Sequence, residues 1–222
     1  MEPEILSNLW QVGGPVFTSS EDAAIYLIRF GDKAALIDAG CGSGHDLLKV
    51  NISECIPENV PIEYLLLTHC HFDHTGGAEV IREEYGCKII AHALDAIYLE
   101  TGDSEVTAAS WYGTEMEPLA IDIKIENDVK DIKIGNGKMT AHHWPGHSPG
   151  SLVYTTKMDR QKVLFGQDVH GPLDASLRSD AKAYQESLKN ILEMDADILC
   201  EGHYGVYRGK KEVQRFIRSF IS

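Results

Sequence analysis

Long apolar segments are missing from this sequence, and so is a basic N-terminal region. No run of about 18 apolar residues occurs, and residues 1–14 begin with acidic rather than basic side chains. We therefore expect a chain that carries no secretory signal and does not span a membrane. Internal repeats, linkers and low-complexity segments are also lacking, so a single domain over residues 1–222 is the simplest expectation.

Cysteines and basic side chains are few. The five cysteines are odd in number and follow no disulfide-framework spacing, which is typical of a reducing compartment and predicts the cytoplasm. The 20 Lys and Arg are outnumbered by 34 Asp and Glu, and the net charge of -14 would repel a phosphate backbone. Bound divalent metals would still make a pocket locally positive. We expect a small-molecule substrate rather than nucleic acid, and a monomer or homodimer.

Strand-like apolar runs and helical segments alternate along the chain. Residues 23–30 and 33–38 predict a hairpin divided by a Gly-Asp turn, and the helix predicted at 77–85 ends at Gly86, as the C-terminus of a helix favours. Helices outside two central sheets, a four-layer α/β/β/α sandwich, account for this order. The other expected helices are 45–55, 181–194 and 211–220, and the other expected strands are 62–68, 88–91, 121–125, 132–134, 139–143, 152–155, 163–165 and 198–200.

The pattern loosens between residues 94 and 118. Aromatic residues, among them Trp111 and Tyr112, lie there between polar and small residues. We expect an insertion or lid that shapes the substrate pocket, and core packing of the same two aromatic residues is an equally weighted alternative.

The most informative stretch is residues 68–74 (THCHFDH), which directly follows an apolar predicted strand. In extended backbone the imidazoles of His69 and His71 project to the same side. Asp73 and His74 come where the chain should turn into a helix, so they could serve a second position nearby. A chance match to this His-x-His-x-Asp-His pattern is expected about once in a thousand such sequences, so the pattern indicates metal binding.

Three further residues complete the pattern. His147 lies in a segment rich in glycine and proline, Asp168 follows the predicted strand 163–165, and His203 follows the predicted strand 198–200. Each of these signals is weak alone. Their order after the histidine motif makes them specific.

In these residues the chain resembles the metallo-β-lactamase-fold hydrolases, especially the glyoxalase II-like and lactonase-like branches. The resemblance extends from residues 36–40 (LIDAG) to Gly202-His203, which is nearly the whole chain. It implies that Asp38 orients a ligand rather than binding metal itself. The implied ligands are His69, His71 and His147 for the first metal, Asp73, His74 and His203 for the second, and Asp168 as the bridge.

The chemistry of these ligands explains why they are needed. Imidazole and carboxylate groups suit zinc, iron or manganese, and an open site of this kind is typical of catalysis. Two ions about 3.5 to 4 Å apart can share a hydroxide, lower its pKa and polarise a carbonyl oxygen. We expect two divalent ions, zinc first, and hydrolysis of a small ester, thioester or lactone with Asp73 and Asp168 as catalytic carboxylates.

Several neighbouring residues have weaker signals. By strand alternation the side chain of Cys70 points away from those of the two motif histidines beside it, so we expect it to pack rather than bind metal. We expect His170 and Tyr204 to line the substrate pocket. The roles of His142 and His143 stay open between pocket and surface, and His45 and His92 are expected to be structural.

Departures from individual branches narrow the resemblance. Glyoxalase II enzymes continue into a helical glutathione-binding domain, which we expect to be missing after His203. Zinc β-lactamases are exported and generally lack the bridging aspartate that Asp168 supplies. Acyl-homoserine lactonases commonly have a tyrosine where this chain has Gly171, and flavodiiron proteins have a glutamate in place of His71. The ester, thioester, lactone, phosphodiester or sulfate ester that is cleaved stays open.

The main alternative is a mononuclear non-haem iron persulfide dioxygenase, which resembles the chain in residues 68–74. Such an enzyme need not occupy a second metal site, and the presence of Asp73, His74 and His203 therefore favours the hydrolase. A non-enzymatic metal-binding role is a third hypothesis, and the open, histidine-rich ligand set disfavours it.

Overall fold

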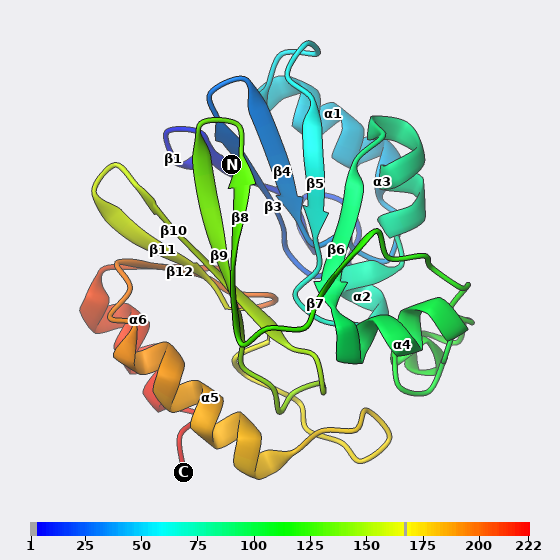
Figure 1. The fold of residues 1–222 in the computed structure, drawn as a ribbon, viewed down its shortest axis with the longest axis vertical. Coiled ribbons are helices and arrows are strands. Elements are labelled where there is room, and N and C mark those ends of the chain that lie inside the picture. Colours follow the sequence, from blue (N-terminus) through cyan, green and yellow to red (C-terminus); the bar gives the residue numbers. More distant parts are fainter. Residues whose placement is uncertain (1–3, 167) are drawn as a thin grey trace.

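Two β-sheets form the centre of the fold in the computed structural model, which describes residues 4–166 and 168–222 (Figure 1). The strands of the first sheet lie in sequence order, with antiparallel pairing from the first to the fourth strand and parallel pairing from there on. They are β1 (Glu4–Leu6), β2 (Leu9–Gly13), β3 (Ile25–Phe30), β4 (Lys33–Ile37), β5 (Ile62–Leu66), β6 (Lys88–His92) and β7 (Ile123–Ile125).

The second sheet is antiparallel except for one pair. Its order is β13-β12-β11-β10-β9-β8, and only β11 and β12 run parallel among its described strands. The strands are β8 (Val129–Ile134), β9 (Gly137–His143), β10 (Leu152–Met158), β11 (Gln161–Phe165), β12 (Ile198–Cys200) and β13 (Val206–Arg208).

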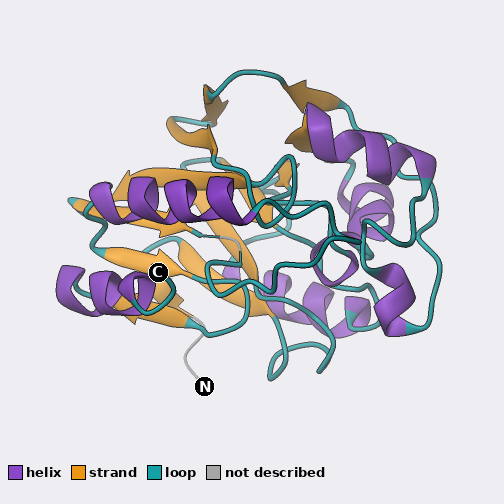
Figure 2. Cartoon of the chain, turned by 90° about the horizontal axis from the view of Figure 1, so that it is seen from below, coloured by secondary structure: helices purple, strands orange, loops and turns teal. Residues whose placement is uncertain are grey.

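Helices cover the outer face of each sheet (Figure 2). Helices α1 (His45–Cys55), α3 (Ala78–Tyr85) and α4 (Ala93–Thr101) share an apolar core with the first sheet. Helices α5 (Ala181–Glu193) and α6 (Lys210–Arg218) share another with the second sheet. A third core lies between the sheets, so the predicted four-layer α/β/β/α sandwich is confirmed.

Alternation along β4 shows why its residues 34–37 are all apolar. Leu36 faces the helix-side core, whereas Ala35 and Ile37 face the core between the sheets. All three are essentially inaccessible to solvent. Where a strand is buried on both faces, it needs apolar residues at every position, and the same holds for residues 163–165 of β11.

Three short strands were not predicted, namely β1, β2 and β13, of which β1 and β13 lie at sheet edges. Their segments carry weak strand signals, and partners distant in sequence hold two of them in place: the Arg208 side chain of β13 donates to the Ile5 carbonyl of β1 over 2.7 Å. The prediction that the pattern becomes irregular at residue 94 was wrong for its first part. Helix α4 forms there, with the His92 side chain at its start accepting from the amide of Leu94 and Gly102 ending it at a φ of 66°.

The ends of the parallel strands bring distant segments together. Asp38 follows β4 and the histidine motif follows β5 in the first sheet, while Asp168 follows β11 and His203 follows β12 in the second. Carboxyl ends of parallel strands lie at one edge of a sheet, which is where open α/β folds place ligands. Among the helices of the described residues, none combines the length and apolar character needed to cross a bilayer.

Candidate metal centre

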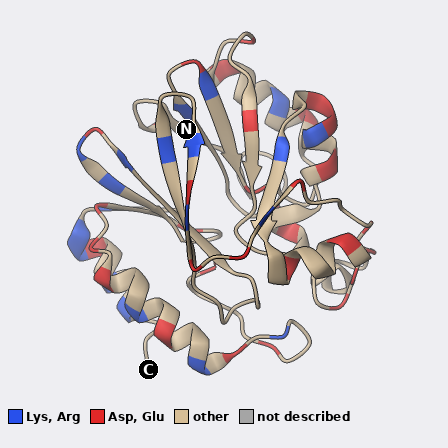
Figure 3. Ribbon diagram, viewed as in Figure 1, with Lys and Arg blue, Asp and Glu red and all other residues tan. Residues whose placement is uncertain are grey.

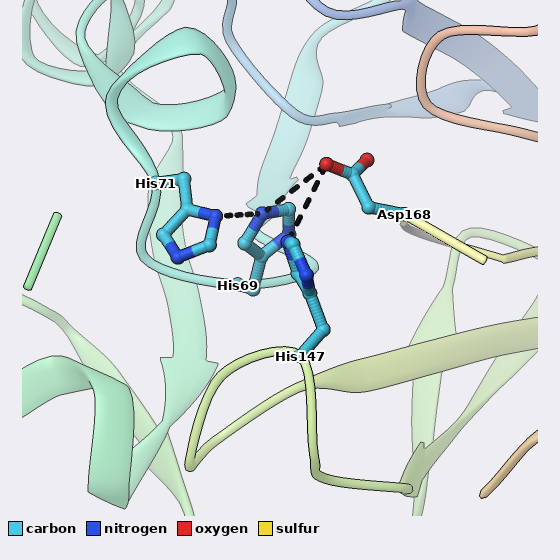
Figure 4. Close-up of side chains that lie close together, drawn as sticks. All are labelled: His69, His71, His147 and Asp168. Carbon is cyan, nitrogen blue, oxygen red and sulfur yellow. Dashed lines mark hydrogen bonds and ion pairs between the residues drawn. The ribbon is translucent and has the colours of Figure 1, made fainter. Parts of the chain in front are cut away.

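The seven residues predicted as metal ligands lie together in two groups. Potential ligand atoms of His69, His71, His147 and Asp168 all lie within 4.8 Å of one another, as Figure 4 shows for their side chains. The atoms of Asp73, His74 and His203 meet the same limit. The structure therefore gathers the predicted set, and the role of each residue as a ligand stays a prediction.

A one-turn helix explains how the motif serves two groups. The backbone is extended at His71, with φ of −69° and ψ of 147°, and α2 (Phe72–Thr75) begins at the next residue. The Thr75 hydroxyl donates back to the carbonyl of His71 over 2.9 Å, which fixes the turn. Extended backbone before α2 keeps the first two imidazoles on one side, and the turn directs Asp73 and His74 to the other group.

Asp38 fixes the ring of His74. Its Oδ2 lies 2.8 Å from His74 Nδ1, and its carboxylate also accepts from the amide and the hydroxyl of Thr68, each over 2.8 Å. With Nδ1 engaged, His74 presents Nε2 toward the other carboxylates, 3.1 Å from Asp168 Oδ1. This contact is the one expected of a carboxylate that orients a metal ligand, and it supports the role predicted for Asp38.

Asp168 lies between the two groups. Its Oδ2 is 3.4 Å from His147 Nε2 and 3.3 Å from His203 Nε2, while its Oδ1 faces His74. The side chain is buried, and it belongs to a segment that reaches the centre from the second sheet. A carboxylate that contacts a histidine of each group fits the bridging role predicted for Asp168, which stays a prediction.

Buried ring nitrogens without a hydrogen-bond partner indicate whether these residues can bind a metal. His147 Nδ1 donates to the carbonyl of Pro172 over 2.9 Å, so in the neutral ring Nε2 is the nitrogen with the lone pair. Within the described residues, that Nε2 is buried without a hydrogen-bond partner, and so is Nε2 of His71. Buried polar atoms are normally paired, and aromatic nitrogen lone pairs beside carboxylates are the donor set that zinc, iron or manganese binds. The residues fit a divalent metal.

The negative charge of the buried carboxylates in the centre also favours binding of a cation. Among the described residues, Asp73 and Asp168 form ion pairs with histidines and with no Lys or Arg. Figure 3 shows that nearby helix α4 carries acidic but no basic side chains. Two buried carboxylates therefore depend on protonated histidines, or on metal, for compensating charge.

The pKa directions of the histidines follow this arrangement. Burial, together with the neighbouring imidazoles, lowers the pKa of His69, and burial with His147 lowers that of His71 to about 3. Burial acts in the same direction on His74 and His203, but Asp168 and its carboxylate neighbours outweigh it. The pKa of His74 is raised well above its usual value and that of His203 is raised to about 10. Without metal, protons on these two histidines balance the carboxylates.

We expect the metal-free protein to lose stability as the pH rises from 7 toward 10. His203 has a folded pKa of about 10 against an unfolded value of about 6.5, so its stabilising contribution is complete below the unfolded pKa and is lost as the pH passes through the folded one. The loss should reach up to about 1 kcal/mol per pH unit. Urea unfolding of chelated protein measures it, with His203→Gln as the variant that should show a smaller loss. Equal pH dependence in both proteins would contradict this origin.

Two buried carboxylates that hold the ligand loops were missed. Asp95 accepts from the amide of Cys70 over 3.0 Å, from the amide of Gly150 over 2.6 Å and from the Ser148 hydroxyl over 2.6 Å. It thereby joins the motif loop to the loop of His147. In the sequence, the only indication of this role was that Asp95 follows closely after the predicted strand 88–91. Its hydrogen-bond partners could not be read from the sequence.

Glu201 is the second missed carboxylate. It is completely buried, and its Oε2 accepts from the amides of His203 and Tyr204, each over 2.7 Å. Its Oε1 lies 2.9 Å from His170 Nδ1. The same carboxylate therefore fixes the loop of one predicted ligand and the ring of a predicted pocket residue. A glutamate adjoining the Gly-His pair was the only available sequence signal.

The predicted pocket residues lie at the rim of the centre. His170 contacts the rings of His203 and Tyr204, with centroids 5.1 and 4.8 Å apart. Tyr112 packs on Phe72 with ring centroids 5.6 Å apart. Burial and then the nearby charge of Asp73 raise the pKa of Tyr112.

Exposure and contacts decide the other open predictions. Trp111 is 53% exposed, so its alternative role in core packing was wrong. Cys70 is buried in the helix-side core, as expected. His142 lies 3.0 Å from the Thr155 hydroxyl, and His143 stacks on His92 with ring centroids 3.7 Å apart. These contacts give His142 and His143 partners outside the candidate centre.

The chain matches one family model and several known proteins. The model of the metallo-beta-lactamase superfamily matches residues 21–203. The acyl-coenzyme A thioesterase MBLAC2 of Gallus gallus is 27% identical over 243 residues, which cover 97% of this chain and 84% of that protein. The probable metallo-hydrolase YqgX of Bacillus subtilis (strain 168) is 31% identical over 147 residues, which cover 65% of this chain and 64% of that protein.

Solved structures show the same architecture. The metallo-beta-lactamase GOB-18 from Elizabethkingia meningoseptica has a TM-score of 0.74 and 28% identity, covering 90% of this chain and 75% of that chain. BJP-1 of Bradyrhizobium japonicum, described as a subclass B3 metallo-beta-lactamase, has a TM-score of 0.75 and 23% identity, with coverage of 98% and 89%. Because BJP-1 is only 23% identical to this chain, its similarity shows the fold alone.

Proposed function

Because the chain belongs to the metallo-beta-lactamase superfamily, we propose that it is a hydrolase that uses two divalent ions, zinc first, to cleave a small acyl thioester or ester. The observation that carries the proposal is the position of Asp168 between two groups of potential ligands. A thioester is the first choice because the relative matched over nearly the whole chain is named an acyl-coenzyme A thioesterase. Iron or manganese could take the place of zinc.

Some side chains of the centre orient the ligand rings, and others would hold the ions. Asp38 and Pro172 hold the rings of His74 and His147 so that the Nε2 atoms of both face Asp168. When bound, the two ions would activate a water molecule and polarise the substrate carbonyl oxygen. His69, His71 and His147 would hold one ion, Asp73, His74 and His203 would hold the other, and Asp168 would contact both.

Exposure indicates where substrate enters. The side chain of His203 is 28% exposed, whereas those of His69 and His74 are 0% exposed and that of Asp168 is 5% exposed. A substrate carbonyl therefore reaches the centre beside His203. The buried side of the centre, formed by the motif histidines, keeps water away from the remaining ligands.

A substrate panel tests the proposal. Protein reconstituted with zinc, iron or manganese is assayed on acyl thioesters, aryl esters and lactones, and oxygen consumption is followed with a persulfide substrate. Hydrolysis of a thioester or ester by the form with two ions is the expected result. Oxygen consumption by a form with one iron, without ester hydrolysis, would instead establish the dioxygenase alternative.

We also expect Trp111→Ala to change substrate preference without loss of metal. The residue is exposed in the short helix η1 (Ala109–Tyr112), whose Tyr112 ring packs on Phe72 beside Asp73. KM should rise about threefold to tenfold for bulky substrates, because an exposed aromatic wall contributes apolar contact and no metal ligand. Steady-state kinetics with metal analysis measures this, and Leu47→Ala, equally exposed on α1 at 53%, is the control. Loss of metal in the Trp111 variant would contradict a role confined to substrate.

A further inference from the structure

A cavity opens directly beside the exposed ligand candidate His203. Its volume is about 480 Å³, within the range of roughly 300 to 1,000 Å³ that small-molecule pockets occupy. Strands β1 and β2, the loop that follows β2, and the segment from Gly202 to Arg208 form its wall. Of the seven candidate ligands only His203 lines it, so the cavity adjoins the exposed side of the centre.

The wall of this cavity is mainly apolar. Ile5, Val16, Phe17 and Val206 line it, and Val16 is 70% exposed. The charged residues in the lining are Glu4 and Arg208, both exposed, and the Arg208 guanidinium already donates to a backbone carbonyl. A large exposed apolar side chain in a concave wall beside a candidate active centre favours an apolar occupant.

Backbone hydrogen bonds connect the cavity floor to the ligand loops. The amide of Ala24 donates to the Gly202 carbonyl over 2.7 Å, and the amide of Ala23 donates to the Asp73 carbonyl over 3.1 Å. The wall loop is closed by bonds within itself, including the amide of Phe17 to the Gly14 carbonyl over 2.9 Å. The cavity is therefore held in fixed register with residues from the second group of potential ligands.

We propose that this cavity, the acyl pocket, binds the apolar acyl chain of the thioester or ester cleaved at the metal centre. The inference rests on the proposed function and adds the substrate class. With the carbonyl beside His203, an acyl chain can lie along Val16, Phe17 and Val206. The charged lining residues Glu4 and Arg208 have opposite signs, so the cavity offers no net positive charge to a phosphate-bearing leaving group.

The test uses the full chain with zinc and a series of thioesters that differ only in acyl length, from acetyl to decanoyl, on a small neutral thiol. We expect kcat/KM to rise about fourfold for each added methylene until the pocket is filled. Val206→Phe narrows the pocket and should remove most of this gain with chain length. Val16→Ser should flatten the rise without risk to the core, because the residue is exposed.

Val129→Ser is the matched control, since this valine is 56% exposed on β8, a strand of the second sheet outside the pocket lining. Zinc content and thermal midpoints accompany each assay. If thioesters are cleaved but kcat/KM changes neither with acyl chain length nor in the two pocket variants, the proposal that this cavity binds the acyl chain is wrong, while the proposed function stands. If no thioester or ester is cleaved by the two-zinc form, both are overturned.

Discussion

The substitution Asp168→Asn should lower hydrolysis by at least about a hundredfold, with one of the two metal ions bound much more weakly. The carboxylate contacts His147 of one group and His74 of the other, so it is the residue most directly linked to a centre with two ions. The asparagine keeps the shape and removes the negative charge that would offset the repulsion between two cations. Turnover of the best panel substrate and metal content per chain are the measurements.

The fold should survive this substitution. Asp168 lies after the end of β11, and the apolar cores are formed by other residues. Asp159→Asn is the control, because it makes the same chemical change at an exposed turn with a φ of 48°, which asparagine tolerates. If the Asp168 variant retains two tightly bound ions and near-normal turnover, Asp168 is not the bridge and the proposed ligand assignment is wrong.

Removal of the metal ions should have the second large effect on hydrolysis, and it should also lower thermal stability. We expect the purified protein to bind two ions per chain, and chelation to lower hydrolysis by at least about a thousandfold, toward the uncatalysed rate. The thermal midpoint should also fall, because each ion present at a hundred times its Kd stabilises the folded state by about 2.7 kcal/mol. Elemental analysis, calorimetric melting and activity recovery on return of zinc measure the three quantities.

The stoichiometry distinguishes the leading mechanisms. The seven predicted ligand residues exceed what one ion can use. A value that stays at one ion per chain, with saturating zinc, iron and manganese each tried, would refute the two-ion centre. The melting control is His142→Ala, which removes an imidazole outside both groups and should leave the effect of chelation unchanged.

Local patterns were sufficient for much of the fold. Periodicity located the hairpin of β3 and β4, and it gave α5 (Ala181–Glu193) and β12 to within a residue, because these elements bury apolar side chains at their own repeat. It did not find β1, β2 or β13, because segments of three to five residues are too short to show a clear repeat. The four-layer arrangement could be inferred because it follows from the alternation of buried strands and amphipathic helices.

For the centre, the sequence by itself determined the candidate ligands. The spacing within residues 68–74 indicates metal binding, and the resemblance to the metallo-β-lactamase-fold hydrolases assigns ligand roles to His147, Asp168 and His203, which the structure brings to the same place. Only the tertiary structure decided that Asp95 and Glu201 hold the ligand loops and that Val16 lines a cavity beside His203. The reason is physical. Side-chain direction follows from local backbone geometry, whereas hydrogen-bond partners and cavities depend on segments that are distant in sequence and meet only when the two sheets pack.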